Sequence, residues 1–183
     1  MRSLAMPASN PSFSNALKEE QVPRRPVRRD GTVSQRTVSD WSGVSAGTLK
    51  NLARIGLLPE ADSMRPHDVV LAQVAAALGA TRSTNRDSQP DARTTEAQKR
   101  DWEAVRVVAE LLLNDASEPV HPRTRLLSLP NRVALFTQDY DLLRLSEEAF
   151  TAGSPFHVLP VGFWYEELQQ KLGASIEGDA IAA

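Results

Sequence analysis

The segment from Gly43 to Pro59, with the sequence GVSAGTLKNLARIGLLP, constrains the fold of this 183-residue chain more than any other. Gly43 suits a tight turn, and Ser45 is a good N-cap for a helix that follows it. The apolar residues then recur at helical spacing, at Leu49, Leu52 and Ile55. Gly56 stands where a helix end favours a left-handed residue, and Pro59 prevents continuation. The segment therefore predicts a turn followed by a short amphipathic helix.

The remaining surface of this helix carries hydrogen-bond donors. A short helix with hydroxyl, amide and cationic donors is typical of major-groove recognition. The candidate DNA-contacting residues are Ser45, Thr48, Lys50, Asn51 and Arg54. Asn51 is the candidate for reading adenine, because its amide can pair with the N6 and N7 edge. As an alternative, any short amphipathic helical hairpin with a serine cap would give a similar pattern.

The same segment matches the pattern G-V-S-x-x-T-L-R-Y-Y-x-x-x-G-L-L without gaps, and so resembles the DNA-binding head of the MerR family. The matching residues are Gly43, Val44, Ser45, Thr48, Leu49, Gly56, Leu57 and Leu58. Lys50 stands in place of the usual Arg, and Asn51 and Leu52 replace two aromatic residues. The resemblance covers about residues 32–80. It implies a winged helix-turn-helix, with residues 59–66 as a minimal wing in which Arg65 touches phosphate.

Charge is divided unevenly along the chain. The net charge is −2, but residues 1–100 hold 15 Lys and Arg against 10 Asp and Glu, whereas residues 101–183 hold 6 against 13. The basic half contains the candidate DNA-binding helix, and the acidic half has a different task or only aids solubility. The chain has no cysteine, which excludes disulfides and thiolate metal sites. No metal or cofactor is expected.

No apolar run is long enough to span a membrane, and the start of the chain lacks a signal-peptide layout. We therefore expect a cytoplasmic protein with no membrane partner. Residues 1–31 are rich in Ser, Pro, Asn and Arg, and they predict a disordered basic arm. The four arginines clustered near its end, Arg24, Arg25, Arg28 and Arg29, are candidates for entering a neighbouring minor groove. The alternative is that they add only phosphate attraction.

Residues 32–42 predict the first helix of the head, with Trp41 packing into its core. Residues 69–78 predict a helix that Gly79 stops, and residues 80–93 predict a linker. A long connecting helix is expected over residues 95–114. Its apolar stripe consists of Trp102, Val105, Ala109, Leu112 and Leu113. This stripe forms a homodimer contact, as the long helix does in MerR relatives, or it closes the core of residues 124–172.

In the last third of the chain, the spacing of apolar residues changes from helical spacing to short apolar runs. Apolar runs at 125–129, 133–137 and 156–160 predict strands, and residues 139–152 and 162–172 predict helices. The expected fold class is mainly α, with a winged helix-turn-helix head over 32–79 and a small α+β unit of order β-β-α-β-α. This unit and the long helix together make up residues 94–172. Residues 173–183 are expected to form a flexible tail.

Catalytic groups give only a weak pattern. His157, Ser128 and Asp139 could be assembled into a Ser-His-Asp set, but no surrounding elbow motif supports it. We therefore expect no enzyme. The sequence favours a sequence-specific DNA-binding protein that acts on double-stranded DNA as a transcriptional repressor or activator. Two alternatives stay open: an excisionase-like factor that bends DNA for an integrase, and an adaptor that binds a protein or ligand through its C-terminal unit.

Overall fold

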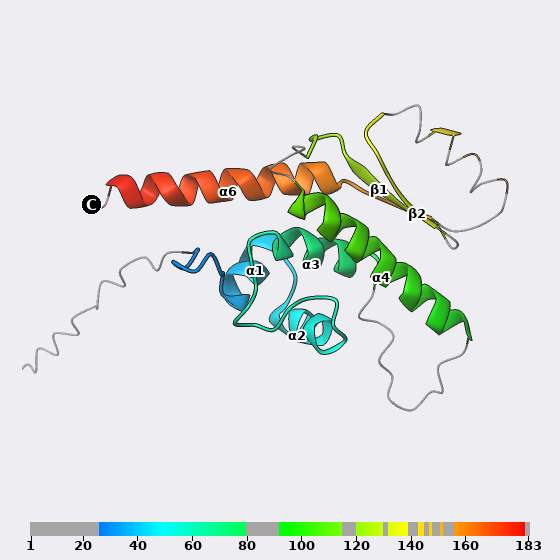
Figure 1. Cartoon of the computed structure of the whole chain (residues 1–183), viewed down its shortest axis with the longest axis horizontal. Coiled ribbons are helices and arrows are strands. Elements are labelled where there is room, and N and C mark those ends of the chain that lie inside the picture. The colour runs from blue at the N-terminus through cyan, green and yellow to red at the C-terminus, as the bar shows by residue number, and fades with distance from the viewer. Residues whose placement is uncertain are drawn as a thin grey trace, which may run out of the picture.

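The structure is a computed structural model of mixed α/β class, in which a small antiparallel sheet lies at one end of the molecule and packs against helices (Figure 1). It describes residues 26–79, 92–114, 120–129, 132–138, 143–144, 147, 151 and 156–181. Within these ranges, only the backbone is described for residues 92–98 and 175–181. The elements form a helical head at the N-terminal side and a sheet flanked by two long helices.

The head consists of α1 (Gln35–Ser42), α2 (Ala46–Arg54) and α3 (Asp68–Ala77). The first two helices begin in the same way, because Ser34 accepts a hydrogen bond from the Thr37 amide at 3.0 Å and Ser45 caps α2 similarly. Gly43 ends α1 with a φ of +71°. The predicted turn and short helix are therefore present.

The inner faces of these helices meet in a common core. Val38 from α1, and Leu49 and Leu52 from α2, are fully buried. Seven of the ten residues of α3 are buried as well, because α3 packs against α1, α2 and two later helices. Trp41 packs at the edge of this core, as its spacing predicts.

The sheet has the strand order β2-β1-β3. The central strand β1 (Arg125–Leu129) pairs antiparallel with β2 (Arg132–Phe136) and with β3 (His157–Leu159). Leu126 faces the main core, whereas Leu127 belongs to a second small cluster on the other side. The three predicted strands are confirmed to within one or two residues at their ends.

Two long helices join the sheet to the head. Helix α4 (Ala92–Leu113) contacts both α3 and the sheet, and α6 (Val161–Ile181) contacts α3 and β1 (Figure 1). A single hydrophobic core therefore runs from Val33 in the head to Leu168 in α6. The expected linker over 80–93 lies outside the described residues, except that α4 already begins at Ala92.

Several segments differ from their predicted form. Residues 26–31 fold onto the head and do not continue the expected arm: Val27 pairs with Val33, and Asp30 accepts hydrogen bonds from Thr32 at 2.9 and 2.7 Å. These hydrogen bonds hold the pKa of Asp30 below its usual range. The folded head thus begins before residue 32. Residues 1–25 lie outside the described part of the chain.

Residues 59–66, the expected minimal wing, form turns and contain no strand. Their anchor is Met64, which is fully buried and accepts a hydrogen bond from the Val33 amide at 2.9 Å. A wing needs two strands that pair with each other, and this short segment instead uses its one buried side chain to fasten a loop to the core.

The C-terminal end differs too. Helix α6 continues to Ile181, beyond Gly173 where the flexible tail was expected. Gly173 does not have a positive φ, so it costs roughly 1 kcal/mol relative to Ala and does not stop the helix. The expected helix over 139–152 lies largely outside the described residues. Leu143, Arg144, Glu147 and Thr151, which are described, are helical.

The apolar stripe of α4 is mostly used within the chain. Val105 and Leu112 are 5% and 7% exposed and belong to the main core, whereas Trp102 and Leu113 are 46% and 64% exposed. The prediction of a dimer face made from the whole stripe is therefore corrected in favour of its alternative, intrachain packing. The periodicity was right, but it could not tell a partner helix from α3 and the sheet.

Candidate nucleic-acid interface

Helix α2 has one buried face and one exposed face. Leu49 and Leu52 are fully buried, and the side chains of Lys50, Asn51 and Arg54 are exposed on the other side. Among the described residues, none of these three side chains has a hydrogen-bond or ion-pair partner. The predicted donors are thus brought together on one accessible surface, which we call the α2 face, and their hydrogen-bonding capacity is available.

The beginning of α2 is narrow and fixed. Ala46 and Gly47 are exposed and have almost no side chain, so the helix can approach another surface closely there. The Ser45 hydroxyl accepts a hydrogen bond from the Thr48 amide at 3.2 Å and lies 2.9 Å from the Thr48 hydroxyl. Thr48 is therefore half buried and takes part in the cap. Only the hydrogen-bonding capacity that the cap leaves unused is available to another molecule.

Both ends of α2 are held by contacts that local sequence patterns only partly predict. Gln35, the first residue of α1, donates from Nε2 to the carbonyl oxygen of Ala46 at 3.1 Å. At the other end, Gly56 has a φ of +78°, and the Leu57 amide donates to the Leu52 carbonyl at 2.9 Å. This is a Schellman arrangement, and it satisfies carbonyl groups that a helix end would leave free. The α2 face is therefore presented by a fixed helix.

The structure describes only some of the predicted DNA-contacting arginines outside α2. Arg65 is exposed in the loop before α3, and its backbone amide donates to Asp68 Oδ2 at 2.7 Å. Arg28 and Arg29 are exposed on the turn that precedes α1. Arg24 and Arg25 lie outside the described residues. The structure thus brings Lys50, Asn51 and Arg54 together, and leaves the contribution of the arm to be tested by binding.

Asp68 anchors the loop that carries Arg65. Its side chain is almost completely buried, and its Oδ1 lies 3.6 Å from His67 Nε2. Burial raises the pKa of the Asp68 carboxyl, while the hydrogen bond from the Arg65 amide and the nearby His67 oppose the rise. The His67–Asp68 pair is explained by this role at the start of α3.

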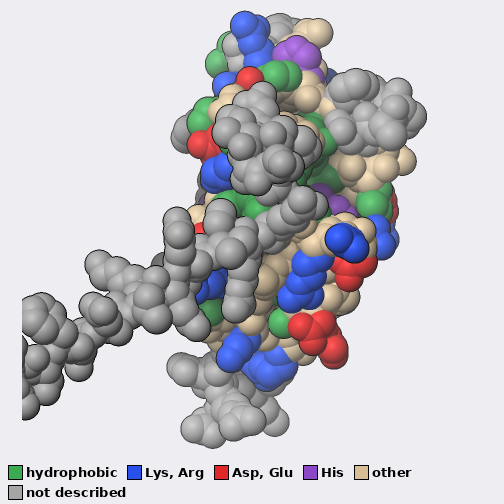
Figure 2. Space-filling model, turned by 90° about the vertical axis from the view of Figure 1, so that its left-hand side faces the viewer, with side chains coloured by type: hydrophobic (Ala, Val, Ile, Leu, Met, Phe, Trp, Pro, Cys, Tyr) green, Lys and Arg blue, Asp and Glu red, His purple; other side chains and the backbone are tan. Residues whose placement is uncertain are grey.

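The head does not have a uniformly basic surface. On the side of the molecule that carries α1, Lys and Arg side chains are interspersed with Asp and Glu side chains (Figure 2). One such pair joins Arg36 Nε to Asp40 Oδ2 at 3.8 Å, and both side chains are exposed, so it contributes little stability. Attraction by total charge alone is therefore modest, and the specific donors of α2 matter more.

The residues of the possible Ser-His-Asp set do not form an accessible site. Ser128 and His157 are paired across β1 and β3, but Ser128 is fully buried and its Oγ has no partner among the described residues. Asp139 lies outside the described residues. A buried hydroxyl cannot reach a substrate. The pairing of Ser128 with His157 therefore places a polar side chain in the core and does not form an accessible catalytic site.

Within the part of the chain that the structure describes, no group of three His, Asp or Glu side chains is arranged to hold a metal ion. None of the helices over these residues combines the length and apolarity that crossing a bilayer requires. No known protein-family model and no curated protein matches this chain.

Sequence reasoning missed two contacts near this face. Gln35 holds the first turn of α2, and Trp102 lies against Gly56 at the last turn. Neither has a local signal, because both contacts join segments that are distant in sequence. The only signals in the sequence were the polar side chain of Gln35 at the start of α1 and the aromatic side chain of Trp102 on an otherwise polar turn of α4.

Proposed function

We propose that this protein binds double-stranded DNA sequence-specifically through α2 and acts as a transcriptional regulator. The observation that carries the proposal is the α2 face. Lys50, Asn51 and Arg54 are exposed and have no partner among the described residues, and Leu49 and Leu52 on the opposite face of the helix are fully buried. An α-helix with its side chains is about 10–12 Å in diameter, so α2 can enter the major groove, whose width is about 12 Å.

The chemistry of the α2 face supports base reading as well as phosphate contact. The Asn51 amide can donate to and accept from the edge of adenine, and Arg54 can donate twice to guanine. The small residues Ala46 and Gly47 allow the start of the helix to lie deep in the groove. Lys50 supplies a cation for a phosphate or a guanine edge. Resemblance of this segment to the MerR head is in keeping with this role.

Phosphate contacts would fix the orientation of the head. Arg65 is exposed on the loop before α3, and Arg28 and Arg29 are exposed on the turn before α1. In the proposal these arginines, together with Arg24 and Arg25, add sequence-independent attraction.

The proposal includes two copies of the chain on a two-fold DNA site. One head of this size reads few bases, and a second copy adds affinity through effective concentration. The buried residues Val105 and Leu112 cannot provide the contact, so self-association would use exposed side chains such as Leu113.

The proposal is tested by selecting sites from random duplexes with the full chain and then measuring binding by fluorescence anisotropy over a range of salt. We expect an enriched sequence, and we expect the double variant Lys50→Ala, Arg54→Ala to weaken binding. Each lost phosphate contact lowers the slope of log affinity against log salt by about 0.9. Arg123→Ala is the matched control, since Arg123 is an exposed arginine next to β1. No enriched sequence, or equal losses in the control, would refute the proposal.

A further inference from the structure

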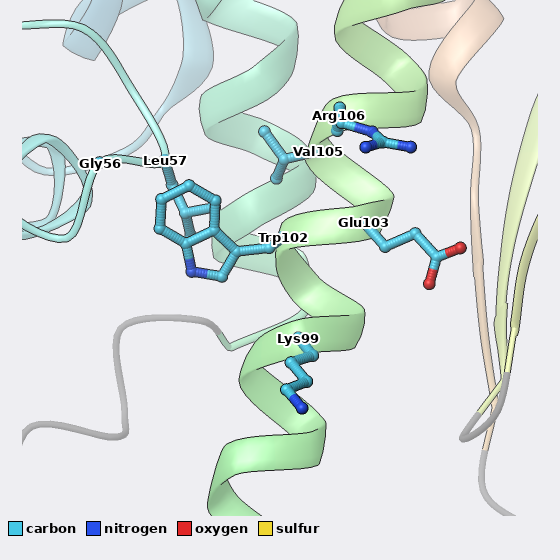
Figure 3. A pocket seen from close by; sticks show the side chains of 7 residues that line it. All are labelled: Gly56, Leu57, Lys99, Trp102, Glu103, Val105 and Arg106. Atoms are coloured by element: carbon cyan, nitrogen blue, oxygen red, sulfur yellow. The ribbon is translucent and has the colours of Figure 1, made fainter.

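A pocket of about 660 Å³ lies between the turn that follows α2 and the middle of α4. Its lining comes from the two sides, with Gly56 and Leu57 on the head and Lys99, Trp102, Glu103, Val105 and Arg106 on α4 (Figure 3). The volume is in the range of pockets that hold small ligands, which is about 300–1,000 Å³. Any occupant would contact the end of α2 and α4 at the same time.

The main apolar surface of the pocket is the indole of Trp102. The side chain points from α4 toward Gly56 and Leu57 (Figure 3), and 46% of the residue is exposed. A β-carbon at residue 56 would lie only 2.9 Å from Trp102 Cη2, so the absence of a side chain at Gly56 allows the ring to lie there. A half-exposed indole beside Leu57 and Val105 offers a stacking surface for another planar ring.

The charged side chains of the pocket differ in how far they are engaged. Arg106 Nε lies 3.4 Å from Glu110 Oε1, and Glu103 extends away from the indole (Figure 3). Lys99 lies one helical turn before Trp102, is exposed, and has no ion pair or hydrogen bond to the other described residues. The ammonium group that can turn toward a ligand on the indole is therefore that of Lys99, and its charge favours an anion.

We propose that this pocket binds a planar aromatic carboxylate, with the ring against Trp102 and the carboxylate near Lys99, and that its occupancy regulates DNA binding. The binding site stands on the pocket itself, whereas the regulatory part rests on the proposed DNA-binding function. A ligand here touches the turn of Gly56 and Leu57 that ends α2. A ligand that binds one position of this turn more tightly than another favours that position. The shift then changes the affinity of the α2 face for DNA.

The first experiment is isothermal titration calorimetry of the full chain with three probes that share a ring system and differ in charge. The probes are 2-naphthoate, neutral 2-naphthol and the cation 2-naphthylmethylammonium. We expect 2-naphthoate to bind most tightly, with a Kd at or below about 1 mM, then naphthol, then the cation. Tightest binding of the cation, or binding of none of the three, would overturn the proposed ligand class.

Variants locate the site. Trp102→Leu removes the stacking surface but keeps an apolar side chain, and it should weaken 2-naphthoate and 2-naphthol by at least about tenfold. Lys99→Gln should weaken 2-naphthoate several-fold and leave 2-naphthol unchanged. Phe163→Leu on α6 is the control, since Phe163 is also an aromatic residue about half exposed. Circular dichroism shows whether each variant is folded. Unchanged affinity in folded Trp102→Leu would overturn the site.

The regulatory part is tested by measuring DNA affinity with and without saturating 2-naphthoate. We expect a change of about 5–150-fold, and the same factor must appear when the ligand is titrated into the DNA complex. The two proposals fail separately. Binding of 2-naphthoate that depends on Trp102 in a protein that does not bind DNA would refute the proposed function and leave the site standing. Unchanged DNA affinity at saturation would refute the regulatory part.

Discussion

Lys171 Nζ donates a hydrogen bond to the carbonyl oxygen of Trp41 at 2.9 Å, joining two residues that are 130 positions apart. Lys171 lies on α6, and Trp41 lies in the last turn of α1. The contact fastens the C-terminal helix to the head, next to a hydrophobic core that both share. Helix α4 lies between α3 and the sheet in the same core. Its buried residues therefore have a structural role in the monomer.

The Val105→Glu variant tests this role. Val105 is 5% exposed, so a carboxylate there would be buried without a partner and should destabilise the chain by at least about 3 kcal/mol. Leu113→Glu on the same helix is the control, since Leu113 is 64% exposed and surface changes stay within about 0.5 kcal/mol. Urea unfolding measures both. A folded Val105→Glu monomer obtained from a wild-type dimer would instead restore the dimer interpretation of the stripe.

Gly56 and Gly43 form a matched pair for the contact with Trp102. Both have positive φ values, +78° and +71°, so an alanine at either position costs about 1–2 kcal/mol in backbone strain. Only at Gly56 does the added carbon also meet a neighbour, Trp102 Cη2, at 2.9 Å. We expect Gly56→Ala to destabilise the protein more than Gly43→Ala, and the added Trp102→Leu change to remove most of the difference. Equal costs in the two single variants would contradict this packing.

The buried carboxyl of Asp68 predicts a pH dependence of stability. Burial raises its pKa in the folded protein above the unfolded value of about 3.9, so the unfolded chain loses this proton at a lower pH than the folded chain does. The wild-type free energy of unfolding therefore loses a contribution as pH rises through this window. Asp68→Asn keeps an acceptor for the Arg65 amide and cannot ionise.

The measurement is urea unfolding of wild type and Asp68→Asn at a series of pH values from 4 upward. We expect the stability of the variant relative to wild type to increase with pH and then to level off above the folded pKa. A relative stability that stays flat, or that decreases with pH, would show that Asp68 is not held in an environment that disfavours its charge.

The local features of the head could be predicted because short-range chemistry determines them. A serine cap, two glycines in the left-handed region and the leucine spacing are enough to place α2 within a residue of its observed bounds. Strands β1 and β2 followed from short apolar runs in the same way. Such signals act within about ten residues, and they need no knowledge of the rest of the fold.

The remaining features depend on contacts between distant segments. The stripe on α4 predicted an apolar face but not its partner, and only the fold places Val105 in the intrachain core. Gly173 resembled a helix end, but α6 continues through it to Ile181. The Trp102 pocket joins residues 56 and 102, so no local pattern could indicate it. The exposed donors of the candidate interface were predictable, whereas the residues that support them were not.

The most direct test of the central claim, that α2 reads DNA bases, is the effect of Asn51→Ala on a selected site compared with random DNA. Both affinities are measured by anisotropy at one fixed salt concentration, with Gln169→Ala as the control, an exposed amide on α6. We predict that Asn51→Ala costs about 1–3 kcal/mol on the selected site and little on random DNA, while the control changes neither. Equal losses of Asn51→Ala on both DNAs, or no loss on either, would contradict base reading by the α2 face.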